Sequence, residues 1–134
     1  SVTVNFRMFP GQTIDDVLEH LHKVIKNKKV EINLLPGWKN PSAVSPTDTR
    51  SFKVIEKICH SMDDKAVVAP YLVMGGTDAC HYQAVCENIY RYSPFLVSTS
   101  LLLTTHGTNE RIPVSVMEDA VKFFKRYIRL ASAE

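Results

Sequence analysis

The chain opens with alternating hydrophobic and polar residues and then changes to a helical spacing. Apolar side chains occupy every second position of Ser1–Phe9, which is the pattern of a half-buried strand. After Thr13 they recur every three or four residues, which predicts an amphipathic helix, and Asp16 stands where a capping box needs a carboxylate. Residues 29–35 alternate again. The pattern predicts a strand–helix–strand unit, which needs more sheet, another domain or another subunit to close a core.

A break rich in Pro, Gly, Ser and Asn follows from Leu35 to Pro46. It predicts a boundary between a first domain of residues 1–40 and a second domain of residues 46–134. Helical and strand-like patterns alternate beyond the break, which favours an α/β layer arrangement. The expected elements are a helix from Asp48 to Met62 capped by Thr47 or Asp48, a strand at Ala66–Met74, a short helix from Thr77 or Asp78 to about Asn88, a strand at Ile89–Val97 with a continuation at Leu101–Thr104, and a last helix with Ser115 and Glu118 as its capping box.

The composition and the net charge of the chain argue against several classes of function. The 134 residues are 45% apolar and 22% charged with a net charge of +2, and no stripe of Lys and Arg interleaved with aromatics indicates a nucleic-acid partner. No apolar run reaches the roughly 18 residues of a bilayer span. Three cysteines without a CxxC pair favour free thiols. The first residue is not Met, which suits a processed or excised piece of a longer protein, so the compartment stays unknown.

Two polar loops, Gly75–His81 and Thr104–Glu110, each follow an apolar run. In open α/β sheets, ligands gather beyond the strand ends, so His81 and His106 are the candidate histidines. Each loop also has a structural explanation, because a loop histidine is more often a hydrogen-bonded surface residue and an Asp at a helix start is often a cap. One histidine with a few carboxylates falls short of the three protein ligands of a catalytic zinc site.

The motifs of these loops resemble a known enzyme family. They are Gly75-Gly76-Thr77-Asp78-Ala79-Cys80-His81-Tyr82, Ile89-Tyr90-Arg91-Tyr92-Ser93-Pro94, His106-Gly107-Thr108-Asn109-Glu110 and, near the start, Asn5-Phe6-Arg7-Met8-Phe9-Pro10-Gly11-Gln12-Thr13. In this order they are similar to the C-terminal portion of zinc-dependent aminoacylase/carboxypeptidase exopeptidases, nearest to carboxypeptidase S, Gly-X carboxypeptidases and N-fatty-acyl-amino-acid hydrolases. The resemblance implies that residues 1–40 are the second half of a ferredoxin-like lid or dimerisation domain. It implies that residues 46–134 are the C-terminal half of an α/β/α catalytic domain.

The resemblance also implies roles for individual residues. His106 corresponds to a terminal ligand of one of two zinc ions, and Glu110 would orient its loop from behind. Arg7 would grip the free carboxylate of the substrate, a task for which the planar guanidinium fork is suited. The loop that lines the substrate site maps onto Gly76, Thr77 and Asp78, with His81 beside it.

The chain departs from the family pattern at two points. Cys80 stands where the family usually carries an Arg, so a second cation for the substrate carboxylate is missing unless Arg7 or His81 replaces it. The family's remaining metal ligands and its general-base Glu belong to His-x-Asp and Glu-Glu pairs, and neither pair occurs in this sequence. The resemblance therefore implies no catalytic residue within this chain. An intact parent would cleave peptide or N-acyl-amino-acid amide bonds next to a free carboxylate, and this chain alone would be inactive.

Two other hypotheses remain. The chain would be a non-catalytic dimerisation or binding module that retains the family loops, and the Cys80 departure favours that alternative. A weaker alternative is a small anion binder that uses Gly75-Gly76 at a helix start, although the loop matches no phosphate-binding fingerprint. The expected partners are a small peptide or N-acyl amino acid, the missing N-terminal part of the catalytic domain, and a second copy of the chain through the unpaired edge of Ser1–Phe9.

Overall fold

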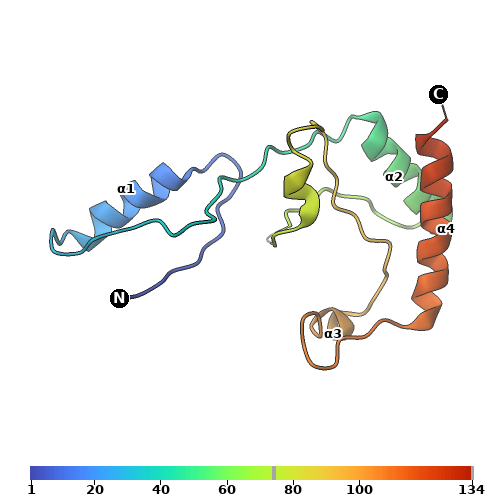
Figure 1. Ribbon diagram of the computed structural model, residues 1–134. Helices are drawn as coiled ribbons and strands as arrows, with labels where there is room; N and C mark the ends of the chain where they lie inside the picture. The colour runs from blue at the N-terminus through green and yellow to red at the C-terminus, as the bar shows by residue number, and fades with distance from the viewer. Residues whose placement is uncertain (74, 134) are drawn as a thin grey trace. The chain divides into compact units, whose positions relative to one another are not determined.

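The structure, a computed structural model, describes residues 1–73 and 75–133 and is helical throughout its regular parts (Figure 1). The elements are α1 (Ile14–Ile25), α2 (Arg50–Met62), the 3₁₀ helix η1 (Asp78–His81), α3 (Thr99–Leu102) and α4 (Val114–Ala131). The chain divides into two compact units, one of Ser1–Ser45 with Met74–Glu87 and one of Pro46–Val73 with Asn88–Glu134. Among the described residues, no helix is long and apolar enough to cross a bilayer.

The first unit is organised by α1, whose start follows the sequence prediction. The Thr13 hydroxyl accepts a hydrogen bond from the Asp16 N–H at 3.3 Å, and the Asp16 carboxylate accepts one from the Thr13 N–H at 2.7 Å. This reciprocal pair confirms the capping box. The next N–H, that of buried Ile14, donates to Asn40 Oδ1 at 3.0 Å. The helix start is therefore fixed by both local and distant side chains.

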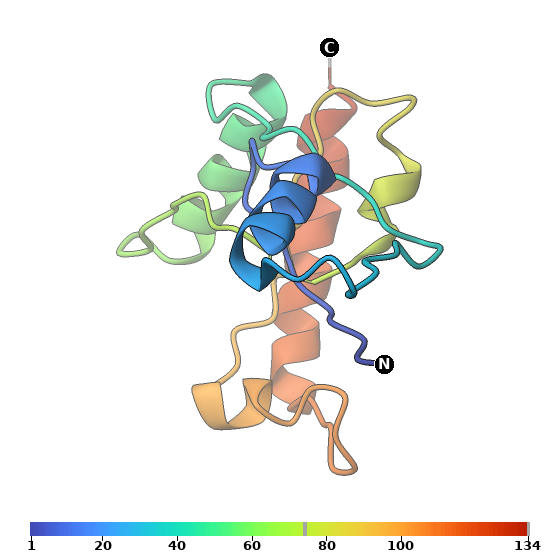
Figure 2. The same ribbon diagram turned by 90° about the vertical axis from the view of Figure 1, so that its left-hand side faces the viewer.

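The second unit is built on the contact between α2 and α4, which lie side by side in Figures 1 and 2. Ile58 and Phe123 are 1% and 2% exposed at the centre of this contact, and Ile55 lies beside them. Their side chains come from one face of each helix, as the three- and four-residue spacing predicted. Partly buried side chains extend this core, namely Val54, Cys59, Tyr90, Tyr127 and Leu130.

Arginines tie the ends of α2 and α4 together. Arg126 on α4 donates to the Ser61 carbonyl at 3.3 Å and to its hydroxyl at 2.7 Å, near the end of α2. Arg50, the first residue of α2, donates to the carbonyls of Leu130 and Ala133 at the end of α4. The last carbonyls of a helix have no partner within the helix, so each arginine satisfies groups that would otherwise need water. Both ends of α2 are therefore tied to the C-terminal part of α4.

The start of α2 lies one residue beyond the expected cap. Thr49, and not Thr47 or Asp48, is the N-cap, and its hydroxyl accepts from the Phe52 N–H at 3.2 Å. The Tyr90 hydroxyl donates to the Pro46 carbonyl at 2.5 Å, and its oxygen lies 2.5 Å from Thr49 Oγ1. Because the single hydroxyl proton of Tyr90 is donated to the Pro46 carbonyl, the Thr49 hydroxyl donates to the Tyr90 oxygen. The lone pairs of the Thr49 hydroxyl remain available to accept from the helix N–H. A tertiary contact selects the cap.

The predicted strands are the main correction. No strand forms among the described residues, so the strand–helix–strand lid and the α/β layers expected from the sequence are not seen in residues 1–73 and 75–133. The expected strands at Ser1–Phe9, 29–35 and 89–97 run without strand pairing, as do the described residues of the 66–74 strand, whose last residue lies outside the description. The backbone N–H and C=O groups of a strand form hydrogen bonds only with a neighbouring strand. An alternating pattern of apolar residues shows that one face can be buried, but it does not provide the neighbouring strand.

Three smaller predictions about helices also fail. The expected strand continuation at Leu101–Thr104 overlaps the short helix α3, which Ser98 caps through the Leu101 N–H at 3.4 Å. α4 begins at Val114 after Pro113, with no side-chain cap, so the predicted Ser115 capping box is absent. A Pro sets φ near the helical value and can start a helix without a capping hydroxyl. The helix expected to run to Asn88 is only the 3₁₀ turn η1.

Candidate functional site

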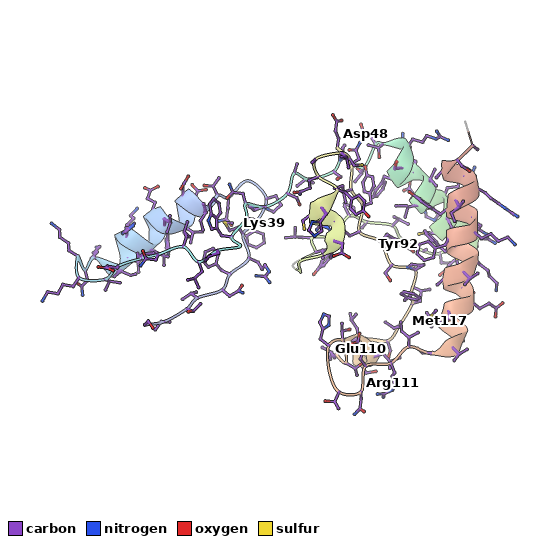
Figure 3. The ribbon with its side chains drawn as sticks, in the orientation of Figure 1. Lys39, Asp48, Tyr92, Glu110, Arg111 and Met117 are labelled. Carbon is purple, nitrogen blue, oxygen red and sulfur yellow. The ribbon has the colours of Figure 1, made fainter. Side chains whose placement is uncertain are left out.

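The loop around His106 lies between α3 and α4 in the second unit, where Figure 3 labels Glu110 and Arg111. The His106 N–H donates to Glu110 Oε2 at 2.9 Å, and the Glu110 N–H donates to the Gly107 carbonyl at 3.3 Å. The Gly107 N–H in turn donates to the Thr104 carbonyl at 2.8 Å. The loop therefore closes on itself, and Glu110 acts on His106 through the main chain, which leaves the imidazole outside these bonds.

The backbone at His106 is left-handed, with a φ of 64°. Few residues other than Gly adopt this region, and for a non-Gly residue it costs about 1 kcal/mol or more. A Cβ on Gly107 would lie 3.0 Å from the Thr104 carbonyl oxygen, so a larger residue there would displace the turn. The polar loop expected at Thr104–Glu110 is therefore present as a turn. The cost at His106 is offset by the Glu110 carboxylate, which accepts the N–H that this conformation presents.

The second polar loop, in the first unit, ends in η1. Thr77 caps η1 through the Ala79 N–H at 3.3 Å, and the Cys80 N–H donates to the Thr77 carbonyl at 3.3 Å. Asp78 and His81 begin and end this turn. Side chains three apart in a 3₁₀ helix are eclipsed, so the carboxylate and the imidazole share one side of η1. A Cβ on Gly76 would meet nothing within 4 Å, so the approach to the loop is open at that point.

Two cations belong to the same unit as this loop. Arg7 Nη1 donates to Asn5 Oδ1 at 2.6 Å and to the Phe6 carbonyl at 3.3 Å, so its guanidinium is engaged with its own segment. Lys39, labelled in Figure 3, donates to Cys80 Sγ at 3.8 Å. The sequence offered no signal for Lys39, because a lysine in a Pro- and Gly-rich break is typical of an exposed linker. Its ammonium nevertheless meets Cys80, the position at which the resemblance implied an Arg.

The predicted site residues thus form two local groups. His106 lies with Glu110 in the second unit, and Thr77, Asp78 and His81 lie together in the first. The approach of the two groups to each other stays a prediction. In residues 1–73 and 75–133, no three His, Cys, Asp or Glu side chains gather where they could hold a metal ion. A catalytic zinc site takes three protein ligands, so the described residues do not make one by themselves.

A polar pair beside the core was not anticipated. The Cys59 thiol donates to the Tyr92 hydroxyl at 3.2 Å, and the Tyr92 ring lies 4.8 Å from that of Phe123. Partial burial, together with the bond to Cys59, raises the pKa of Tyr92 above its ordinary value. Tyr92 is therefore a neutral structural group at physiological pH. Tyr92 was expected only as part of a strand and of a family motif, and its cysteine partner lies on α2.

Comparisons with known proteins identify the family. The family described as Peptidase family M20/M25/M40 matches residues 4–130. A probable carboxypeptidase S-like 2 of Dictyostelium discoideum is 31% identical over 96% of this chain and 25% of its own length. The N-fatty-acyl-amino acid synthase/hydrolase PM20D1 of Xenopus tropicalis is 33% identical over 96% of this chain and 25% of its own length. The PM20D1 protein of Homo sapiens is 30% identical over 98% of this chain and 27% of its own length.

The chain spans about a quarter of the length of these curated relatives. No solved structure matches it. The match to the family covers nearly all of the sequence, including the Gly75–His81 and Thr104–Glu110 loops, and it confirms the resemblance drawn from those motifs. The chain belongs to peptidase family M20/M25/M40.

Proposed function

We propose that this chain contributes the C-terminal portion of the catalytic site of an M20-family exopeptidase or amidohydrolase. Its substrates are peptides or N-acyl amino acids, cleaved at the amide bond next to a free carboxylate. Relatives named as a carboxypeptidase and as an N-fatty-acyl-amino acid synthase/hydrolase support this substrate class. The observation that carries the proposal is the His106 loop, where the Glu110 carboxylate holds the backbone and the imidazole stays outside the loop's hydrogen bonds.

On this proposal His106 supplies one ligand of a two-zinc centre. A neutral imidazole is a common zinc ligand, and a loop held by its own hydrogen bonds presents it with little loss of entropy on binding. The other ligands and the general base come from polypeptide beyond these residues, since the described part gathers no three-ligand group. This chain alone is accordingly expected to bind metal weakly and to lack turnover.

The substrate side of the proposal rests on η1 and on Arg7 and Lys39 of the first unit. Thr77, Asp78 and His81 line the approach next to the open position at Gly76. Arg7 and Lys39 supply positive charge for the substrate carboxylate, and Lys39 compensates for the cysteine at position 80 because its ammonium lies 3.8 Å from that sulfur. In this proposal residues 1–40 remain a lid segment and residues 46–134 a catalytic segment.

The direct test supplies the rest of the family domain in trans. The chain is mixed with the remaining three-quarters of a relative's sequence, and hydrolysis of an N-acyl amino acid is followed with and without zinc. We expect no turnover from the chain alone and metal-dependent turnover from the mixture. His106→Ala should lower that turnover at least about 100-fold, because a lost metal ligand weakens both metal binding and activity.

Two outcomes would contradict the proposal. One is robust zinc-dependent hydrolysis by the homogeneous chain alone, and the other is a His106→Ala mixture as active as its parent. His60→Ala is the matched control, because His60 is an exposed histidine on α2 and should leave activity unchanged. The contribution of Lys39 is read from the same assay, where Lys39→Ala should raise KM several-fold and Lys39→Arg should restore it.

A second candidate function is a non-catalytic binding or dimerisation module. The cysteine at position 80, in place of the family's usual Arg, favours it. This candidate predicts that the mixture folds and binds an N-acyl amino acid but shows no turnover with any divalent metal. Binding by calorimetry without hydrolysis would therefore replace the first proposal with the second.

A further inference from the structure

Lys39 and Cys80 form a contact between two segments that are far apart in the sequence. The Lys39 ammonium donates to the Cys80 sulfur at 3.8 Å, across 41 positions of the chain. Both residues belong to the first unit, and Lys39 is labelled in Figure 3. The lysine comes from the Pro- and Gly-rich break, and the cysteine is the third residue of η1. The pair therefore joins a loop to a hydrogen-bonded turn.

The surroundings of this pair leave the positive charge on the sulfur side uncancelled. In the part of the chain that the structure describes, no carboxylate pairs with the Lys39 ammonium. The Cys80 N–H donates to the Thr77 carbonyl at 3.3 Å, which holds the cysteine in the turn. Its side chain is partly buried, and the approach beside it is open at Gly76. The sulfur therefore lies next to a cation where a small molecule can reach it.

The three cysteines of the chain have different surroundings. Cys86 is exposed, and the Cys59 thiol donates to the Tyr92 hydroxyl at 3.2 Å. Cys80 is partly buried and accepts from an ammonium. A cation stabilises the thiolate, which is the form that peroxides oxidise, and reactive cysteines are partly exposed in electropositive surroundings. Exposure alone would make Cys86 the first thiol to react, whereas the charge of Lys39 points to Cys80.

We propose that Cys80 is a modification site, oxidised by hydrogen peroxide and then joined to Lys39 through a sulfur–nitrogen bond. In the first step the sulfur attacks the peroxide, the O–O bond breaks, and a sulfenic acid forms while one water leaves. In the second step the Lys39 ammonium releases a proton to solvent, and the amine attacks the sulfur and displaces a second water. The peroxide gains the two electrons that the sulfur loses.

The placement of the two groups favours this product over a free sulfenic acid. Nζ of Lys39 already lies 3.8 Å from the sulfur, so the second step is an intramolecular reaction between groups that are held together. The flexible lysine stem lets the amine close the remaining distance without a movement of η1. The bond would tie the break to η1 and remove the charge of Lys39. Its effect on substrate binding rests on the proposed function, but the bond itself does not.

The test is mass spectrometry of the full 134-residue chain after brief exposure to hydrogen peroxide. We expect a product that is lighter by two hydrogens, with the peptide of Lys39 linked to that of Cys80 in a digest. A thiol reductant should reverse the link. A disulfide also removes two hydrogens, so the treatment is repeated on the Cys86→Ser variant, which should keep the link between lysine and cysteine.

Two variants at position 39 separate the two steps. Lys39→Arg keeps the cation but presents a poorly nucleophilic guanidinium, so Cys80 should stop at a sulfenic acid that dimedone traps. Lys39→Ala also removes the cation and should slow the oxidation of Cys80 at least about 10-fold. Lys29→Ala, at an exposed lysine of the same unit, is the matched control and should change neither the rate nor the link. Circular dichroism verifies that each variant keeps its helices.

Three outcomes would overturn the proposal. One is a chain in which peroxide leaves Cys80 unmodified or oxidises Cys86 faster. Another is an oxidation of Cys80 that proceeds at the same rate in Lys39→Ala. The third is a disulfide of Cys80 in place of the link to Lys39. None of these results involves the hydrolysis assay, so a failure here leaves the proposed function standing, and a failure of that assay leaves the link standing.

Discussion

The α2–α4 pair and the segment of residues 66–73 are both rich in apolar side chains, yet only the pair buries them. Ile58 and Phe123 are 1% and 2% exposed in the pair, whereas Val67 and Tyr71 are 90% and 89% exposed in the segment. A helix satisfies its backbone within itself and needs only a packing surface. A strand needs a neighbour for its backbone as well as a surface for its side chains. The difference separates the apolar segments that this chain buries by itself from those that it leaves exposed.

The largest effect is expected from a substitution in the buried core between α2 and α4. Phe123→Ala should lower the free energy of unfolding by about 3–5 kcal/mol, because it leaves a cavity between α2 and α4 and removes the ring contact with Tyr92. Urea unfolding followed by circular dichroism measures the change. Tyr71→Ala is the matched control at an exposed aromatic and should cost less than about 0.5 kcal/mol. Equal losses in the two variants would contradict the assignment of the core.

A smaller effect is expected where the arginines close the helix ends. Arg126→Ala should cost about 1 kcal/mol, since the Ser61 carbonyl and hydroxyl lose their donor but remain close to water. Thermal unfolding would show this as a modest fall in Tm. Arg129→Ala, on the exposed side of the same helix, should leave Tm unchanged. If both variants behave alike, the tie between the helix ends contributes nothing.

In the His106 loop the expected effect is local. Glu110→Ala should raise hydrogen exchange at the His106 amide about 10-fold, as expected when an N–H loses a charged acceptor worth about 1 kcal/mol. Glu110→Gln keeps a carbonyl oxygen and should restore most of the protection. Overall Tm should hardly change in either variant. An amide that exchanges at the same rate in all three proteins would show that the carboxylate does not hold the loop.

The smallest effect is a pH dependence at the start of α1. Hydrogen bonds from the Thr13 hydroxyl and N–H lower the pKa of Asp16 below 3.8. A carboxyl with a lowered pKa stabilises the fold fully above the unfolded value of 3.8, and this contribution fades as pH falls through the folded pKa. Amide exchange of α1 measured between neutral pH and pH 2 should accelerate in that window beyond its intrinsic pH dependence. Asp16→Asn should remove the extra acceleration, and its persistence would assign it to another group.

The parts of the fold that sequence reasoning predicted are those decided by near neighbours. The Thr13–Asp16 capping box and the apolar faces of α2 and α4 depend on residues three or four apart. A polar loop around His106 was also expected, and the structure adds that His106 itself is left-handed. Family motifs then placed the two polar loops within one family.

What the sequence did not predict depends on distant residues. Strand pairing was expected from alternation alone, and the pairing partners are absent from the described residues. The cap at Thr49 is selected by Tyr90, and the contact of Lys39 with Cys80 joins positions far apart in the chain. Neither has a local signature. Within α4 the residue types did not separate the buried face from the exposed one. Phe123 is 2% exposed, whereas its neighbour Phe124, which the helical spacing also assigned to the buried face, is 46% exposed.

The central claim is that the apolar segment of residues 67–73 pairs with no strand among the described residues. Hydrogen exchange of the chain, resolved by residue, tests it most directly. The amides of Ile58 and Phe123 should exchange at least about 100-fold more slowly, relative to their intrinsic rates, than those of Val67 and Tyr71. Protection of Val67 and Tyr71 equal to that of the α2–α4 core would show that the segment is already paired, and it would contradict the account.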